Sequence, residues 1–151
     1  MTPTPRPRPT HLKLLSIDFD GLLHPVGTGI TQINTTFFGF LPVLEAFLAP
    51  HAEVRVLVHS TWRYSYQAAA LQMFLGGLGE RFVGAAPRGP RYESVLWFIQ
   101  QNPQFASYRI LDDDPREFPD PPPAEVIFCD PLLGITDPQL QAQLRAWLTN
   151  P

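Results

Sequence analysis

Short apolar runs alternate along the chain with longer segments in which apolar residues recur every three or four positions. The short runs predict five strands, at residues 11–17, 53–58, 81–84, 108–111 and 126–129. The longer segments predict four helices, at residues 36–48, 62–75, 91–101 and 138–148. Strands that alternate with helices need crossover connections and therefore run parallel. The pattern predicts an α/β protein, a three-layer α/β/α sandwich with a mainly parallel five-stranded sheet.

Two segments fall outside this pattern. Residues 1–10 alternate threonine or arginine with proline, a composition typical of polyproline II or of a flexible tail. Residues 21–35 contain glycine and proline and predict a short flap, with Asn34 or Thr35 as the cap of the following helix. No repeat or change in composition divides the remainder, and 151 residues suit one domain. We expect a proline-rich tail at 1–10 and a single domain at 11–151.

Composition excludes several classes of function. The formal net charge of −3 and the pI of about 5.7 provide no electrostatic footprint for tight binding to nucleic acid of any sequence. The single cysteine, Cys129, cannot form an internal disulfide, which fits a reducing compartment. No apolar run approaches the roughly 18 residues of a membrane span, and the N-terminal residues lack the apolar core of a signal peptide. We therefore expect a cytoplasmic protein without a membrane partner.

Polar side chains collect where the predicted strands end. The residues that follow the first, second and fourth strands are Asp18 and Asp20, Ser60 and Thr61, and Asp112 and Asp113. In open parallel sheets the carboxyl ends of the strands meet at one edge, where ligands bind. Asp18 and Asp20 lie two positions apart and share a face, so their charges repel unless a cation or a proton intervenes. Several carboxylates in one crevice predict Mg²⁺, which prefers oxygen ligands and keeps positions for a substrate phosphate.

The basic residues near this edge are arginines. Lys13 is the only lysine in the chain, so a mechanism that needs a later lysine is excluded. Arg88 and Arg91 flank the start of the third predicted helix. An arginine and a hydroxyl beside a divalent cation complete a set of groups that binds phosphate. The residues therefore indicate a phosphorylated substrate.

Four segments in order resemble the motifs of the haloacid dehalogenase-like hydrolase superfamily: DFDGLL at 18–23, the strand ending in Ser60, the basic residue Arg91, and ILDDD at 110–114. Three others resemble the stand-alone haloacid dehalogenase-type domains related to those of Swiss-army-knife RNA repair proteins: HSTWR at 59–63, APRGPRYESVLWF at 86–98 and DPLLGIT at 130–136. The resemblance covers residues 12–136 and implies a Rossmann-like fold. The gaps that hold cap domains in other members are short here, so we expect a capless fold.

The resemblance implies a Mg²⁺-dependent phosphatase that acts through a phosphoaspartyl intermediate. Asp18 would be the nucleophile, and Asp20 the general acid and base. Ser60 would hydrogen-bond the phosphoryl group, and Arg91 would offset its negative charge. The superfamily most often has lysine at the position of Arg91. Arg88 is a rival for the role of Arg91.

Further residues near the strand ends are candidates for the site. Thr61 and Arg63 are candidates for substrate binding, beside Ser60 and Arg88, but Ser60 or Thr61 could instead cap the following helix, and Arg63 could instead tie down a loop. The implied Mg²⁺ ligands are Asp18, the backbone carbonyl of Asp20, Asp112 and Asp113. His59, at the end of a strand, is expected to be a structural donor, and Trp62 a packing residue.

The substrate and one alternative function stay open at this point. An open, capless site admits a polymer end as readily as a metabolite, and the resemblance points to nucleic-acid or nucleotide phosphate ends. The alternative is a non-catalytic binding or regulatory module on the same fold. A phosphoacceptor receiver domain is excluded because its acceptor belongs at the third strand, which ends here in Gly84 and Ala85, and because no lysine follows Lys13.

Overall fold

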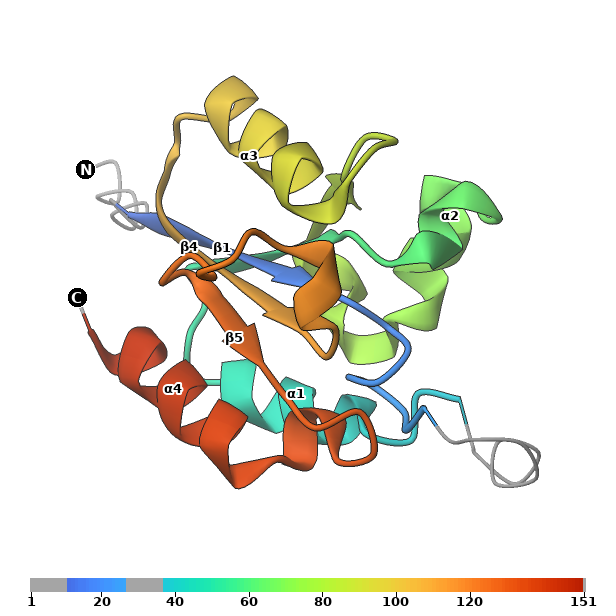
Figure 1. Cartoon of the computed structure of the whole chain (residues 1–151), viewed down its shortest axis with the longest axis vertical. Coiled ribbons are helices and arrows are strands. Elements are labelled where there is room, and N and C mark those ends of the chain that lie inside the picture. Colours follow the sequence, from blue (N-terminus) through green and yellow to red (C-terminus); the bar gives the residue numbers. More distant parts are fainter. Residues whose placement is uncertain (1–10, 27–36, 151) are drawn as a thin grey trace, which may run out of the picture.

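The computed structural model describes residues 11–26 and 37–150, which fold around a five-stranded parallel sheet (Figure 1). The strands are β1 Leu12–Ile17, β2 Val54–Val58, β3 Phe82–Ala85, β4 Phe105–Asp112 and β5 Val126–Phe128. They lie in the order β3-β2-β1-β4-β5, and every neighbouring pair is parallel. The carboxyl ends of all five strands therefore lie at one edge of the sheet. The predicted α/β class is confirmed.

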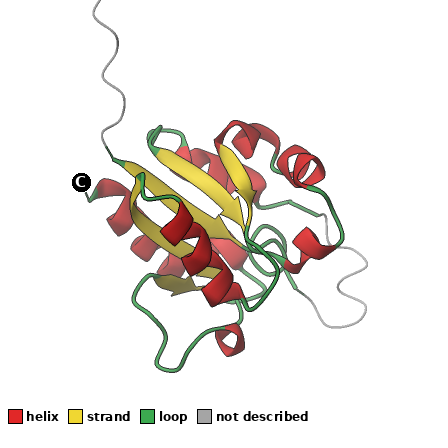
Figure 2. Cartoon of the chain, turned by 90° about the horizontal axis from the view of Figure 1, so that it is seen from above, coloured by secondary structure: helices red, strands yellow, loops and turns green. Residues whose placement is uncertain are grey.

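Helices cover both faces of the sheet. They are α1 Leu41–Leu48, α2 Ala68–Phe74, α3 Arg91–Gln101 and α4 Pro138–Thr149, with short 3₁₀ turns η2 Thr61–Tyr64, η3 Gly76–Arg81, η4 Pro115–Glu117 and η5 Gly134–Thr136. Figure 1 shows α3 on one side of the sheet and α1 and α4 on the other, and Figure 2 shows the strands as the layer between them. This is the predicted three-layer arrangement.

The alternation of side chains along β1 supplies both faces of the core. Leu15 and Ile17 pack in the cluster that includes residues of α1, α2 and α4, whereas Leu14 packs with Val95 of α3. Successive strand residues point to opposite faces, so a central strand covered by helices on both sides needs apolar side chains on each face. The side chains of Leu14, Leu15 and Ile17 are all fully buried. Packing on both faces therefore fixes the position of β1 and of the residues at its carboxyl end.

Three elements differ from the predictions by more than one residue at an end or in their continuity, and the other ends agree to within one residue. The first helix begins at Leu41 and not at 36, because residues 37–40 form a turn in which Phe38 has a φ of 60°. The predicted helix at 62–75 was wrong as one element, since it divides into η2 and α2. β4 begins at Phe105, three residues before the prediction, because it pairs with β1 as far as Leu12.

Other predictions fall on residues that the structure does not describe. The tail at 1–10 and most of the flap at 21–35 lie outside the described residues, so they stay predictions. Asn34 and Thr35 also lie outside them, but their predicted role as the cap of the first helix was wrong, because α1 begins at Leu41 with Phe40 at its N-cap. Between β2 and α3, a fully described segment, the chain forms only η2, α2, η3 and β3. None of the helices in residues 11–26 and 37–150 is long and apolar enough to cross a membrane.

Candidate functional site

Three carboxylates converge at the carboxyl edge of the sheet. Asp18 directly follows β1, Asp112 is the last residue of β4 and Asp113 comes next. β1 and β4 are neighbours, with Ile17 beside Leu111, so strand pairing brings Asp18 and Asp112 together. One oxygen from each of the three carboxylates lies within 4.8 Å of the others. The sequence predicted that these residues lie at one edge of the sheet, and the structure shows that they form a cluster there.

Arg91 is the basic residue that contacts this cluster. It is the first residue of α3, and its Nη1 donates to Asp18 Oδ2 at 3.1 Å and to Asp112 Oδ1 and Oδ2 at 3.0 and 2.8 Å. Burial opposes its charge, but Asp18 and Asp112 outweigh burial and raise the pKa of Arg91. Arg88 is exposed, and its guanidinium lies over the ring of Tyr64, 4.9 Å from the centroid. Of the two candidates for the basic residue, Arg91 is the one that contacts the acidic cluster.

Asp112 is the most fully hydrogen-bonded member of the cluster. Besides Arg91, it accepts from His59 Nε2 at 2.8 Å and from the backbone N–H of Asp114 at 2.9 Å. Burial pushes its pKa upward, but the hydrogen bond from His59 and the charge of Arg91 leave the pKa below its ordinary value. Each carboxylate oxygen of Asp112 therefore accepts two hydrogen bonds from the protein.

His59 is fully buried and links Asp112 to β1. Its Nδ1 lies 2.7 Å from Ser16 Oγ, and burial lowers the pKa of the imidazole, which favours the neutral form. Because the carboxylate only accepts, the proton belongs on Nε2, and the Ser16 hydroxyl donates to Nδ1. The expected structural donor is confirmed, and the group that it orients is Asp112.

The cluster carries more negative than positive charge. Burial and the charge of Asp112 raise the pKa of Asp18 well above its ordinary value, and Arg91 only partly offsets them. Burial and Asp112 likewise raise the pKa of Asp113 to about 6. Gly21 has a φ of +79°, and a Cβ at this position would collide with the Asp113 carboxylate. A glycine is therefore required where the turn after β1 meets Asp113.

Asp20 has different surroundings from Asp18. Its side chain is 45% exposed, compared with 3% for Asp18. His24 Nε2 lies 2.7 Å from its Oδ1, and Trp62 Nε1 donates to its Oδ2 at 3.1 Å. The hydrogen bonds from His24 and Trp62 prevail over partial burial and lower the pKa of Asp20. The two aspartates thus have opposite pKa shifts: without a metal ion, their surroundings favour the neutral form of Asp18 and the ionised form of Asp20.

The residues after β2 have separate positions. Ser60 is buried, and its Oγ caps η2 by accepting from the backbone N–H of Trp62 at 3.2 Å, while Thr61 is exposed. Arg63 donates to the carbonyl oxygens of His59, Ser60 and Gly89, so it ties the β2 end to the loop before α3. Its buried Nε has no hydrogen-bond partner in the described part of the chain.

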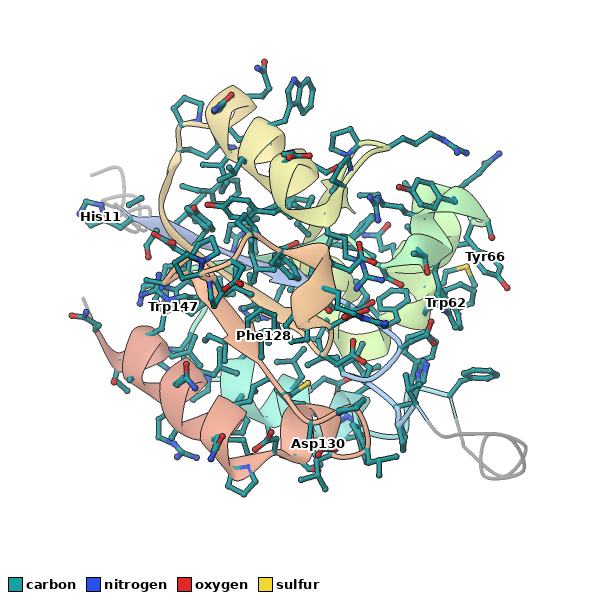
Figure 3. All side chains as sticks on the ribbon, viewed as in Figure 1. His11, Trp62, Tyr66, Phe128, Asp130 and Trp147 are labelled. Carbon is teal, nitrogen blue, oxygen red and sulfur yellow. The ribbon has the colours of Figure 1, made fainter. Side chains whose placement is uncertain are left out.

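An aromatic cluster lies beside Asp20. We define it as Phe19, Phe37, Phe38, Trp62, Tyr66 and Phe74, whose rings contact one another edge-on, tilted or stacked. Phe37 is 64% exposed and Tyr66 44%. Figure 3 shows Trp62 and Tyr66 close together on the α2 side of the molecule. The cluster therefore presents aromatic surface next to the acidic site.

Sequence reasoning missed two contacts of Asp20. Trp62 does pack as predicted, but its indole N–H also donates to Asp20, which is 42 positions away. No local pattern reveals such a contact. The second contact is with His24, which lies four positions after Asp20, a spacing that could have suggested a link across the turn.

Comparison with known proteins adds one match. Residues 14–140 match the family model described as the HAD domain in Swiss Army Knife RNA repair proteins. No curated protein and no solved structure matched the chain.

Proposed function

The chain belongs to the family of HAD domains found in Swiss Army Knife RNA repair proteins, and from this premise and the site geometry we propose that it is a Mg²⁺-dependent phosphomonoesterase. Membership of this family indicates a hydrolase-type domain. The proposal goes further by assigning a phosphoaspartyl intermediate on Asp18 and a role to each residue around it.

The observation that carries the proposal is the asymmetry between Asp18 and Asp20. Asp18 is buried, and both its oxygens have donors: Oδ1 accepts from the backbone N–H of Phe19 at 2.8 Å, and Oδ2 accepts from Arg91. Asp20 is half-exposed and lies outside the Arg91 contacts. A fixed carboxylate suits nucleophilic attack, and a carboxyl group reachable from solvent suits proton exchange with a leaving group and with water.

Two steps follow from these positions. In the first, an oxygen of Asp18 bonds to phosphorus as the bond from phosphorus to the leaving oxygen breaks, and Asp20 gives its proton to that oxygen. In the second, Asp20 takes a proton from water as the water oxygen attacks phosphorus and the bond to Asp18 breaks. Inorganic phosphate leaves, and both aspartates return to their starting states.

The acidic cluster has a suitable set of donors for Mg²⁺. One oxygen from each of the three carboxylates lies within 4.8 Å of the others, and together the carboxylates outnumber Arg91, which contacts Asp18 and Asp112. Because protein donors already occupy Asp112, we propose Asp18, Asp113 and the backbone carbonyl of Asp20 as direct ligands, with Asp112 orienting Arg91. When bound, Mg²⁺ supplies positive charge that favours ionised carboxylates and phosphate oxygens.

Phosphorylated ends of nucleic acids or nucleotides are the substrate class that the surroundings favour. Exposed aromatic rings such as those of Phe37 and Tyr66 are surfaces on which bases stack. The guanidinium groups of Arg63 and Arg88 lie 4.5 and 4.9 Å from the centroid of the Tyr64 ring. They bring positive charge to the surface around Tyr64.

The decisive test is trapping of the covalent intermediate. Protein incubated with labelled substrate and Mg²⁺, then quenched in acid, should retain label that hydroxylamine releases, as an acyl phosphate does. Asp18→Asn should abolish both label and turnover. Asp114→Asn is the matched control: Asp114 is adjacent to the cluster but caps η4 and pairs with Arg116, so activity should persist.

Two results would contradict the proposal in different ways. Turnover that survives in Asp18→Asn would overturn the assignment of the nucleophile. A wild-type protein that binds Mg²⁺ but hydrolyses no ester in a panel of nucleotides, oligonucleotide ends, sugar phosphates and phosphopeptides would favour the binding or regulatory module.

A further inference from the structure

The side chain of Asp20 is held at both carboxylate oxygens by donors from two distant parts of the chain. His24 comes from the turn after β1, and Trp62 from the turn after β2. Their donor nitrogens lie 2.7 and 3.1 Å from Oδ1 and Oδ2. Each oxygen keeps a second lone pair for a substrate or water. The carboxylate is therefore fixed in direction while it remains accessible from solvent.

The proton on His24 is placed by its other nitrogen. His24 Nδ1 accepts the backbone N–H of Phe38 at 3.2 Å, so Nε2 carries the proton and donates it to Asp20. His24 is only 2% exposed, and its ring lies 5.1 to 5.9 Å from those of Phe37, Phe38 and Trp62. The tautomer and the direction of the ring are thus both determined by the structure.

The backbone around His24 is also specialised for this contact. Phe38, whose N–H meets His24, has a φ of 60°, in the left-handed region that side-chain-bearing residues rarely occupy. Such strain persists only where the surroundings impose it, and it concentrates at functional sites. The backbone N–H of Gly21 donates to the carbonyl of His24 at 2.9 Å and closes the turn between Asp20 and His24.

We propose that His24 and Trp62 are positioning residues that aim the Asp20 carboxyl group at the leaving oxygen. This inference rests on the proposed phosphomonoesterase function and adds two residues to it. Neither residue takes part in the proton transfer. Each restricts rotation of a half-exposed side chain that would otherwise adopt several rotamers, which matters because proton transfer in the transition state requires hydrogen-bond geometry.

Leaving groups of different basicity separate this role from general support of the fold. The p-nitrophenolate ion leaves without a proton, whereas the benzyl alkoxide needs one. In Trp62→Phe, which keeps an aromatic ring but loses the N–H, kcat/KM for benzyl phosphate should fall about tenfold while that for p-nitrophenyl phosphate falls less than about twofold. His24→Leu should behave in the same way, and His24→Gln, which retains a donor, should recover most of the loss.

Phe74→Leu is the packing control. The ring centroids of Phe74 and Trp62 lie 5.6 Å apart, but Phe74 has no donor for Asp20. Its variant should therefore change kcat/KM for the two substrates by the same factor. A parallel loss in Trp62→Phe and His24→Leu, or no loss in either, would overturn the inference while the phosphomonoesterase function stands. A wild-type protein that hydrolyses neither ester would overturn that function and this inference with it.

Discussion

Asp18, Asp112 and Asp113 form a cluster of three carboxylates in which Arg91 contacts only Asp18 and Asp112, and this imbalance of charge has measurable consequences. Burial and mutual repulsion raise the pKa values of Asp18 and Asp113, while hydrogen bonds from His59 and Arg91 keep that of Asp112 low. The metal-free site is thus expected to hold protons that a divalent cation would displace.

Stabilisation of the protein by Mg²⁺ should depend on pH. Asp113 has a folded pKa of about 6, above its ordinary value of 3.8, so the metal-free folded state binds more protons than the unfolded chain between these values. The stability of the metal-free protein should therefore fall as the pH rises through this window. Mg²⁺ requires the ionised carboxylate, so its increase of the melting temperature should be larger at about pH 8 than at about pH 5.

Calorimetry or dye-monitored unfolding with and without Mg²⁺ measures this difference. In Asp113→Asn the pH dependence of the Mg²⁺ effect should become smaller, and the remainder should come from Asp18, whose pKa is also raised. An equal rise in melting temperature at both pH values would exclude Asp113 as the group that couples metal binding to protons.

Arg91 should tolerate lysine better than an uncharged residue. A single nitrogen, Nη1, makes all its contacts with Asp18 and Asp112, so the site uses a point charge and not the two-pronged guanidinium fork. Arg91→Met leaves these buried carboxylates unpaired and should cost about 3–5 kcal/mol of stability as well as activity. Arg91→Lys should retain measurable turnover. Urea unfolding and steady-state kinetics test this, and equal losses in the two variants would contradict it.

At the scale of elements, α4 is anchored to β1 by the only lysine of the chain. Lys13 is buried, and its Nζ donates to the carbonyl oxygens of Trp147, Leu148 and Asn150 at 2.9, 3.4 and 2.8 Å. A positive charge at the C-terminal end of a helix also complements the helix dipole. The lysine therefore has a structural task at the amino end of β1, away from the acidic cluster.

Lys13→Met should lower the free energy of unfolding by about 1–3 kcal/mol, because it leaves carbonyl groups without their donor. Turnover per folded molecule should be unchanged. Arg145→Met offers the comparison on the same helix: Arg145 is exposed and only lies over the Phe47 ring, so its loss should cost less than about 0.5 kcal/mol. Urea unfolding would refute the anchor if the two variants had equal stability.

The turn that follows β1 shows how one element determines several contacts. Within the four residues from Gly21 to His24, the backbone of Gly21 lies against Asp113, and its carbonyl oxygen accepts a hydrogen bond from the Cys129 thiol. At the end of the turn, the His24 side chain contacts Asp20. A left-handed glycine makes this approach sterically feasible. The element thus links β1 to both β4 and β5 at the site.

For the whole molecule, binding of a polyanion requires a local basic surface, because the net charge is −3. The arginines next to Tyr64 supply one at the rim of the site. If phosphorylated oligonucleotide ends are the substrate, KM for an oligonucleotide should rise with salt concentration. A plot of log KM against log salt concentration should have a slope of about one per phosphate contact, whereas KM for an aryl phosphate should change little.

Arg88→Ala should reduce this salt dependence of KM for the oligonucleotide. Arg145→Ala, which removes an exposed charge from α4 on the other side of the sheet, should leave it unchanged. Identical salt dependence for the oligonucleotide and the aryl phosphate would argue against a polymer substrate.

Much of the architecture followed from the sequence because burial leaves a local periodic signature. The apolar run before Asp18 predicted β1, and α3 was predicted with the same bounds that the structure shows, 91–101. Prediction failed where long-range pairing extended β4 to Phe105 and where the segment at 62–75 divided into two elements. In both places neighbours distant in sequence override local preference.

The sequence by itself determined the alternation of strands and helices and the presence of acidic residues at the strand ends. Only the tertiary structure decided which of these residues meet. It places β4 beside β1, chooses Arg91 over Arg88 as the contact of Asp18, and brings Trp62 to Asp20. The reason is physical: the burial pattern of one element is local, but strand order and helix position minimise a free energy that sums contacts over the whole chain.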